Sequence, residues 1–162
     1  MGILSTATAA LQSLLSGETG IAWALGNGSS ATGSNLDLPI EIRTENVSAE
    51  IAEKGLVRYP MITLYCDRLT SSGREKFANI SVSLNVTAEL RVSGNNIASV
   101  SEQSMAYTEA ILAVLDCHKG VWAPGIQYLG GYDVTFQQMK KGGSQLLQIT
   151  KIAMPLKAYD CQ

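Results

Sequence analysis

The side chains best suited to covalent chemistry in this 162-residue chain are three cysteines and a single histidine. Asp116, Cys117 and His118 are consecutive, which is the composition of a cysteine–histidine nucleophile pair. Successive side chains on a helix diverge by about 100°, so these residues are not expected to form a relay with one another. His118 falls at the end of a predicted helix, where the helix dipole favours a cation, and we interpret it as a capping or core-edge residue.

Other patterns that carry chemistry are missing or incomplete. The cysteines show no C-x-x-C spacing, and no cluster of His, Cys and Asp supplies the three or four ligands of a metal site. Gly26-Asn27-Gly28 with Ala31 matches part of a dinucleotide-binding fingerprint and follows IAWAL, a run compatible with a short strand, but the required helix does not follow. The sequence therefore predicts no catalytic residue, no cofactor and no metal.

Two other classes of function remain open at this point. A small cysteine-dependent hydrolase would use Cys66 or Cys117, and its thiol would alkylate rapidly below about pH 7. A small-ligand binding module would contain a closed apolar pocket of several hundred cubic ångströms.

The most regular segment is 80–92. Every even position from Ile80 to Val92 is apolar, and the odd positions between them are polar or charged. This period of two predicts a strand of about 40 Å with one buried face and one polar face. A strand of that length projects beyond its sheet or crosses a subunit boundary.

Hydrophobic spacing and composition place the remaining elements. Helices are predicted at 4–16 and 97–118, and loops at 26–36, 67–76 and 121–131. Shorter runs predict strands at 38–44, at 61–66 after Pro60, at 132–136 and at 146–158, with a helical turn or two at 47–54. The order predicts one α+β domain spanning 1–162, with two main helices on an antiparallel or mixed sheet of four to five strands.

Charge is scarce and unevenly distributed. Charged residues make up 16% of the chain and the net charge is −2, which excludes a polybasic nucleic-acid binder and indicates permanent subunit contacts. No apolar run reaches about 18 residues, so no membrane-spanning helix is expected. Residues 1–53 contain one basic and six acidic residues, whereas residues 119–162 contain five basic and two acidic ones. This asymmetry suggests a head-to-tail contact between subunits, the kind that generates rings.

The interface residues expected from these patterns fall into three groups. A basic hairpin turn, with two glycines free to take positive φ, is formed by Lys140, Lys141, Gly142 and Gly143. Its acidic counterpart, interpreted as solvated rather than as an acid–base pair, consists of Glu41, Glu45, Glu50 and Glu53. The third group is a pair of exposed aromatic residues in the 121–131 loop, Trp122 and Tyr128.

The element order, with its short motifs, resembles the tail-terminator proteins of tailed bacteriophages. The motifs are PMITLY at Pro60–Tyr65, the strand Ile80–Val92, the helix Ser99–His118, Gly131-Tyr132-Asp133, and the strand Leu146–Ala158. The resemblance covers about residues 56–160 and the first helix. It implies a non-enzymatic ring, commonly a hexamer, that caps the completed tail tube and meets the neck.

The same resemblance implies the partners and the location. These are the tail tube and sheath proteins, the connector proteins of the head, and genomic DNA passing through the lumen. The protein would be assembled in the bacterial cytoplasm and reside in the virion. The Gly/Ser-rich segment 26–35 and the acidic stretch 36–55 depart from the family pattern. Another neck or tail-completion component is therefore the alternative within this class.

Overall fold

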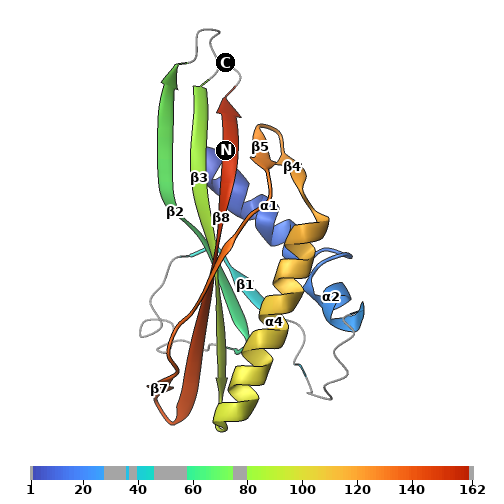
Figure 1. Ribbon diagram of the computed structural model, residues 1–162, viewed down its shortest axis with the longest axis vertical. Coiled ribbons are helices and arrows are strands. Elements are labelled where there is room, and N and C mark those ends of the chain that lie inside the picture. The colour runs from blue at the N-terminus through green and yellow to red at the C-terminus, as the bar shows by residue number, and fades with distance from the viewer. Residues whose placement is uncertain (1, 28–35, 37–39, 46–57, 75–79, 161–162) are drawn as a thin grey trace.

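The computed structural model describes residues 2–27, 36, 40–45, 58–74 and 80–160. Most of the predicted 26–36 loop and the predicted helical turns at 47–54 lie outside these ranges. Three long strands form the centre of the sheet, namely β2 (Met61–Arg74), β3 (Ile80–Gly94) and β8 (Gln145–Asp160). Figure 1 shows them running along the long axis of the molecule.

Short strands complete an eight-stranded mixed sheet. β1 (Glu41–Arg43) pairs parallel with the first residues of β2, and all other pairs are antiparallel. The far edge of β8 is shared by β7 (Lys140–Gly142), β6 (Asp133–Phe136) and β5 (Ile126–Tyr128), and β5 pairs with β4 (Gly120–Ala123). The α+β class is confirmed, and the sheet is larger than the predicted four to five strands because these three- and four-residue strands add to it.

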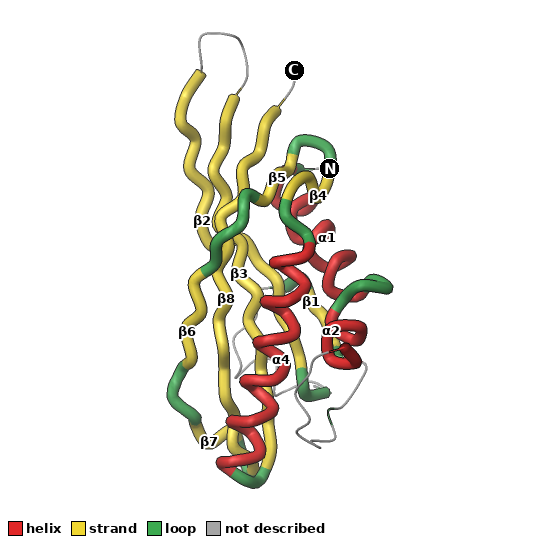
Figure 2. The backbone as a smooth tube through the Cα atoms, turned by 45° about the vertical axis from the view of Figure 1, so that its right-hand side comes forward, coloured by secondary structure: helices red, strands yellow, loops and turns green. Residues whose placement is uncertain are grey.

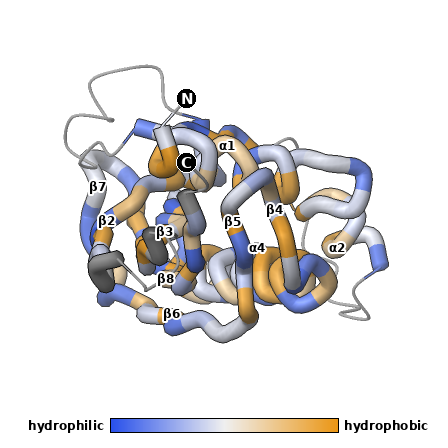
Figure 3. The backbone as a smooth tube through the Cα atoms, turned by 90° about the horizontal axis from the view of Figure 1, so that it is seen from above, coloured by the Kyte–Doolittle hydropathy of each residue, from blue (hydrophilic) through white to orange (hydrophobic). Residues whose placement is uncertain are grey.

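The helices pack on one face of this sheet. α1 (Ile3–Ser16) and α4 (Ile97–Cys117) match the two predicted helices, and the IAWAL run forms the helix α2 (Ile21–Asn27) instead of a strand. The view along the long axis in Figure 3 separates the β2–β3–β8 layer from α4 and α2. The Oδ1 of Asn96 caps α4 by accepting from the backbone N–H of Ala98 at 2.9 Å.

The core lies between the sheet and the helices, as the alternation in β3 predicts. Even residues of β3 are buried there, with Leu84 1% exposed and Val86 fully buried. They pack in one cluster with residues of α1 and α4 such as Leu11 and Ile111. Ile97 belongs to the same hydrophobic pattern of α4 but is 68% exposed at its first turn.

β2 is longer than the sequence predicts. Residues 67–74, expected as part of a polar loop, continue the strand and pair with β3 as far as Ile80. A bulge between Cys66 and Arg68 precedes this extension. The reason is that β3 offers backbone hydrogen-bonding groups along its whole length, and polar side chains on β2 remain exposed while its backbone pairs. Figure 1 shows the upper ends of the three long strands projecting past the helices.

Pro155 lies in the interior of β8, where it pairs in register with Asn85 of β3. On its other edge β8 pairs with β6 through residues 150–153 and with β5 through residues 156–158. Pro155 therefore falls at the junction between two partners, where the loss of one N–H interrupts neither ladder.

Replacing Leu84 with aspartate is expected to unfold the protein. Burying an unpaired carboxylate at this position costs more than about 4 kcal/mol, out of a total stability of about 5–15 kcal/mol. Ser83→Asp is the matched control, because Ser83 is exposed on the opposite face of the same strand. Its effect should stay within about 0.5 kcal/mol. Urea denaturation followed by circular dichroism compares the two variants, and a native-like transition in Leu84→Asp would contradict the assignment of faces.

Candidate interaction surface

The basic hairpin is present and exposed. Lys140 and Lys141 lie on β7, opposite Leu147 and Leu146 of β8, and both lysine side chains are exposed. The turn falls one residue later than predicted, at Gly143 and Ser144. Gly143 alone adopts a positive φ, of 63°, and Gly142 instead pairs with Gln145 as the last residue of β7. Neither lysine forms an ion pair with a residue that the structure describes.

The acidic group is only partly described. Glu41 lies in β1 and is bound to Arg43 at 2.6 Å, while Glu45 is exposed just beyond the strand. Glu50 and Glu53 lie outside the described residues. β1 pairs with β2 and β7 pairs with β8, so the three long strands separate Lys140 and Lys141 from Glu41 in the order of the sheet.

The prediction of an exposed aromatic residue is wrong for Tyr128, which is fully buried. Trp122 is half-buried and packs against the core. The β4–β5 hairpin folds back on α1 and sets the two rings 4.8 Å apart. The indole Nε1 of Trp122 donates to the carbonyl of His118 at 2.6 Å, and the hydroxyl of Tyr128 donates to Gly131. Burial raises the pKa of Tyr128 to about 12. The ring contact and the two hydrogen bonds show that both side chains contribute to the fold of their own subunit.

His118 caps α4, as the sequence predicts. Its Nδ1 lies 2.8 Å from the carbonyl of Val114, which can only accept, so Nδ1 carries the proton. The other ring nitrogen, Nε2, lies 3.0 Å from the hydroxyl of Thr19, which can donate or accept. Both ring nitrogens are engaged away from Cys117.

Of the two cysteines that the structure describes, Cys66 is poorly placed to act as a nucleophile. Burial raises the pKa of the Cys66 thiol, which disfavours the reactive thiolate, and its Sγ donates to the carbonyl of Arg68 at 3.4 Å. Cys117 is exposed at the end of α4 and precedes His118, the residue that caps this helix. No group of His, Cys, Asp and Glu in the described part of the chain is arranged to hold a metal ion.

A buried polar network on the opposite face of the sheet from the helices was not predicted. Glu89 and Arg91 are 6% and 3% exposed and form an ion pair at 2.7 Å. The other oxygen of Glu89 accepts from the hydroxyl of Tyr65 at 3.0 Å and lies 3.6 Å from the Nζ of Lys151. Burial and the charge of Glu89 raise the pKa of Tyr65.

This network shows that the face expected to be simply polar is buried along part of its length. Thr87, buried on the same face, donates to Asp67 at 3.0 Å. The signal in the sequence is the placement of Glu89 and Arg91 two residues apart inside the most regular strand, which puts both charges on one face. Such a pair in mid-strand indicates a partnered, partly desolvated site.

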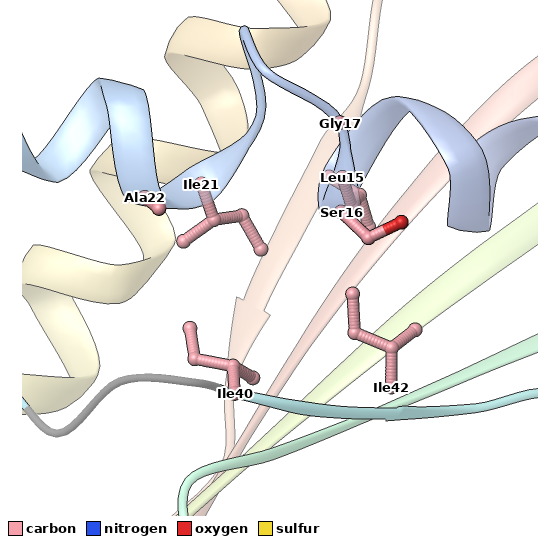
Figure 4. Close-up of a pocket in the computed structure, with 7 residues that line it drawn as sticks. All are labelled: Leu15, Ser16, Gly17, Ile21, Ala22, Ile40 and Ile42. Atoms are coloured by element: carbon pink, nitrogen blue, oxygen red, sulfur yellow. The ribbon is translucent and has the colours of Figure 1, made fainter.

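An apolar pocket of about 330 Å³ opens between the end of α1, α2 and β1. Figure 4 shows Ile40 and Ile42 of the β1 region opposite Ile21 and Leu15. The hydroxyl of Ser16, the one polar side chain of its described lining, already donates to the carbonyl of Gln12. The pocket has the volume of a small-ligand site but lacks the convergent polar groups that orient a ligand.

No protein-family model matches the chain, and no curated protein matches it significantly. Within the described ranges, no helix has both the length and the apolar character needed to cross a bilayer.

Removing the carboxylate of Glu89 is expected to lower the free energy of unfolding by about 3–5 kcal/mol, because Arg91 loses its partner in a buried setting. Glu41→Ala is the matched control. It breaks a pair of similar length to Arg43 whose side chains are 35% and 32% exposed, and should cost no more than about 1 kcal/mol. Equal losses for Glu89→Ala and Glu41→Ala in urea denaturation would show that the Glu89 network is not a desolvated ion pair.

Proposed function

We propose that this protein is a structural protein of a tailed-phage virion. It forms an oligomeric ring, with six subunits as the family norm, at the head-proximal end of the tail. The ring terminates the tail tube and joins it to the neck, and it contacts the tube, the sheath and the connector. The proposal is based on the resemblance in element order and motifs described above, and the α+β architecture is compatible with it.

The observation that carries the proposal is the placement of charged side chains that form no ion pair with another described residue. Lys140 and Lys141 are exposed on β7, which pairs with the outer edge of β8, and Glu45 is exposed just beyond β1, which pairs with the outer edge of β2. Opposite charges on different sides of one subunit favour a heterologous contact, in which one surface meets a different surface of the next copy. Repetition of such a contact closes into a ring when the rotation between subunits allows it.

The chemistry of the described residues favours assembly over catalysis. His118 is committed to capping α4, and burial disfavours the thiolate of Cys66. A cysteine-dependent hydrolase would require a thiol that alkylates rapidly below about pH 7. Slow alkylation of Cys66 under native conditions is the expected result, and fast alkylation would favour the hydrolase.

The assembly state tests the proposal directly. Gel filtration with light scattering at micromolar concentration is expected to show a ring, either for the protein alone or after addition of completed tail tubes. Electron microscopy of the mixture should place density at the tube end that faces the head. A protein that stays monomeric and never decorates tubes would refute the proposal, and density elsewhere in the neck would favour the alternative connector role.

Reversing the charge of the β7 lysines is expected to weaken assembly without unfolding the subunit. An exposed charge pair contributes at most about 1 kcal/mol to the fold, so Lys140→Glu with Lys141→Glu should leave the melting temperature nearly unchanged. The assembly defect should be largest at low salt and shrink in high salt, where ions screen the wild-type attraction as well. Lys157→Glu, at another exposed lysine, is the control. Wild-type assembly of the double variant at low salt would show that the hairpin is not an interface.

A further inference from the structure

The projecting part of β2 has a free edge. β1 pairs with β2 only from Met61 to Thr63, and no described strand pairs with the same edge of β2 between Leu64 and Arg74. Figures 1 and 2 show this part of β2 at the margin of the sheet, away from the helices. A long free edge presents a row of unpaired N–H and C=O groups, which is a template for pairing with another strand.

The side chains along this edge are exposed, and they include opposite charges and an apolar residue. Asp67, Arg68, Leu69, Thr70 and Ser71 are all exposed, and Leu69 is 50% exposed. Leu69 therefore adds apolar surface to an edge that no described strand covers, and an uncovered edge is a site for pairing with another chain.

The bulge fixes which side chains share a face. Leu64 and Cys66 pack toward the helices, as does Leu69, which pairs with Leu84. Tyr65 points to the opposite face, where it donates to Glu89. Three further residues share that opposite face, as their hydrogen bonds or registers show: Asp67, Arg68 and Thr70.

We propose that the free edge of β2 pairs antiparallel with the same edge of a second copy of this chain, about a two-fold axis between Asp67 and Arg68. Residues directly opposite in an antiparallel pair must point to the same face. In this register Asp67 lies opposite Arg68 of the other copy, Cys66 opposite Leu69, Tyr65 opposite Thr70, and Leu64 opposite Ser71. All four pairs match in face, because the bulge shifts the alternation by one residue at the axis.

The same register also matches the chemistry of the side chains. The two-fold axis creates two Asp67–Arg68 contacts of opposite charge and two apolar Cys66–Leu69 contacts. If one strand slid by one residue relative to the other, in either direction, side chains that point to different faces of the sheet would lie opposite one another. The second copy is the occupant that this edge fits, because the edge is complementary to itself.

This contact is distinct from the proposed ring contact. It is isologous and uses β2, whereas the ring contact is heterologous and uses β7. It therefore goes beyond the proposed function, and each can fail without the other. Lys140→Glu with Lys141→Glu should leave the β2 contact intact.

A single substitution tests the register. Leu69→Cys sets a new thiol opposite the natural Cys66 of the second copy, within the Cα separation of about 4.4–6.8 Å that a disulfide needs. Because Leu69 is exposed, the variant should fold. Mild oxidation in a background carrying Cys117→Ser and Cys161→Ser should give a covalent dimer on non-reducing electrophoresis.

The matched control adds Cys66→Ser to Leu69→Cys. It removes the natural thiol and leaves the two new thiols roughly 10 Å apart along antiparallel strands, beyond disulfide reach. Loss of the dimer in this control supports the register. The absence of a dimer from Leu69→Cys, or an equal yield with and without Cys66, would overturn the proposal.

Charge exchange tests the centre of the contact. Arg68→Asp sets like charges against each other twice per dimer and should weaken association at least tenfold in sedimentation equilibrium. Asp67→Arg combined with Arg68→Asp restores opposite charges and should recover most of that loss. Equal association of the single and double variants would contradict a two-fold contact at this position.

Discussion

The antiparallel ladder between β3 and β8 is the constraint on which the rest of the structure depends. It pairs every residue of β3 from Ile80 to Gly94 with a residue of β8, without a register shift. A shift by one residue would turn the whole apolar face of β3 toward the solvent, so the buried even positions fix the register. The helices then have one apolar surface on which to pack. The short strands β5, β6 and β7 occupy only the edge of β8 that β3 leaves free.

The ladder also explains why charges are tolerated near the centre of the sheet. Glu89 forms a buried ion pair with Arg91, and its second carboxylate oxygen contacts Tyr65 and Lys151. Replacing such a group of charges by apolar residues is often neutral or stabilising in other proteins, so net stability is a weak reason for its presence. A network spanning β2, β3 and β8 is satisfied only when all three strands are in register. It therefore contributes more to the uniqueness of the pairing than to its strength.

The sequence predicted correctly those elements whose own pattern of apolar residues defines a buried face. The alternation in β3 and the spacing in α1 and α4 report burial directly, and their predicted bounds agree with the structure within a few residues. The predictions were wrong where pairing with a neighbouring strand determines the structure of a segment. The polar residues 67–74 form a strand because β3 extends beside them, and Tyr128 is buried because a three-residue strand packs on β8. Strands of three or four residues are too short to show a period. The same distinction applies to the candidate surface. The exposure of Lys140 follows from its charge and was predicted, whereas the partial burial of Trp122 depends on tertiary packing and was not.

The length of the central ladder has a consequence for the order in which the chain folds. β2 and β3 are neighbours in the sequence and can pair early, whereas β8 is separated from β3 by about 50–80 residues and is synthesised after every other described element. Until then, β3 has an unoccupied edge, and its apolar face is covered only by the helices α1, α2 and α4. The nascent chain thus passes through a stage in which its most apolar strand is accessible to other chains. Folding of this protein is consequently expected to be slow for its size and sensitive to the concentration of unfinished chains, and the late arrival of β8 ends that exposure in one cooperative step.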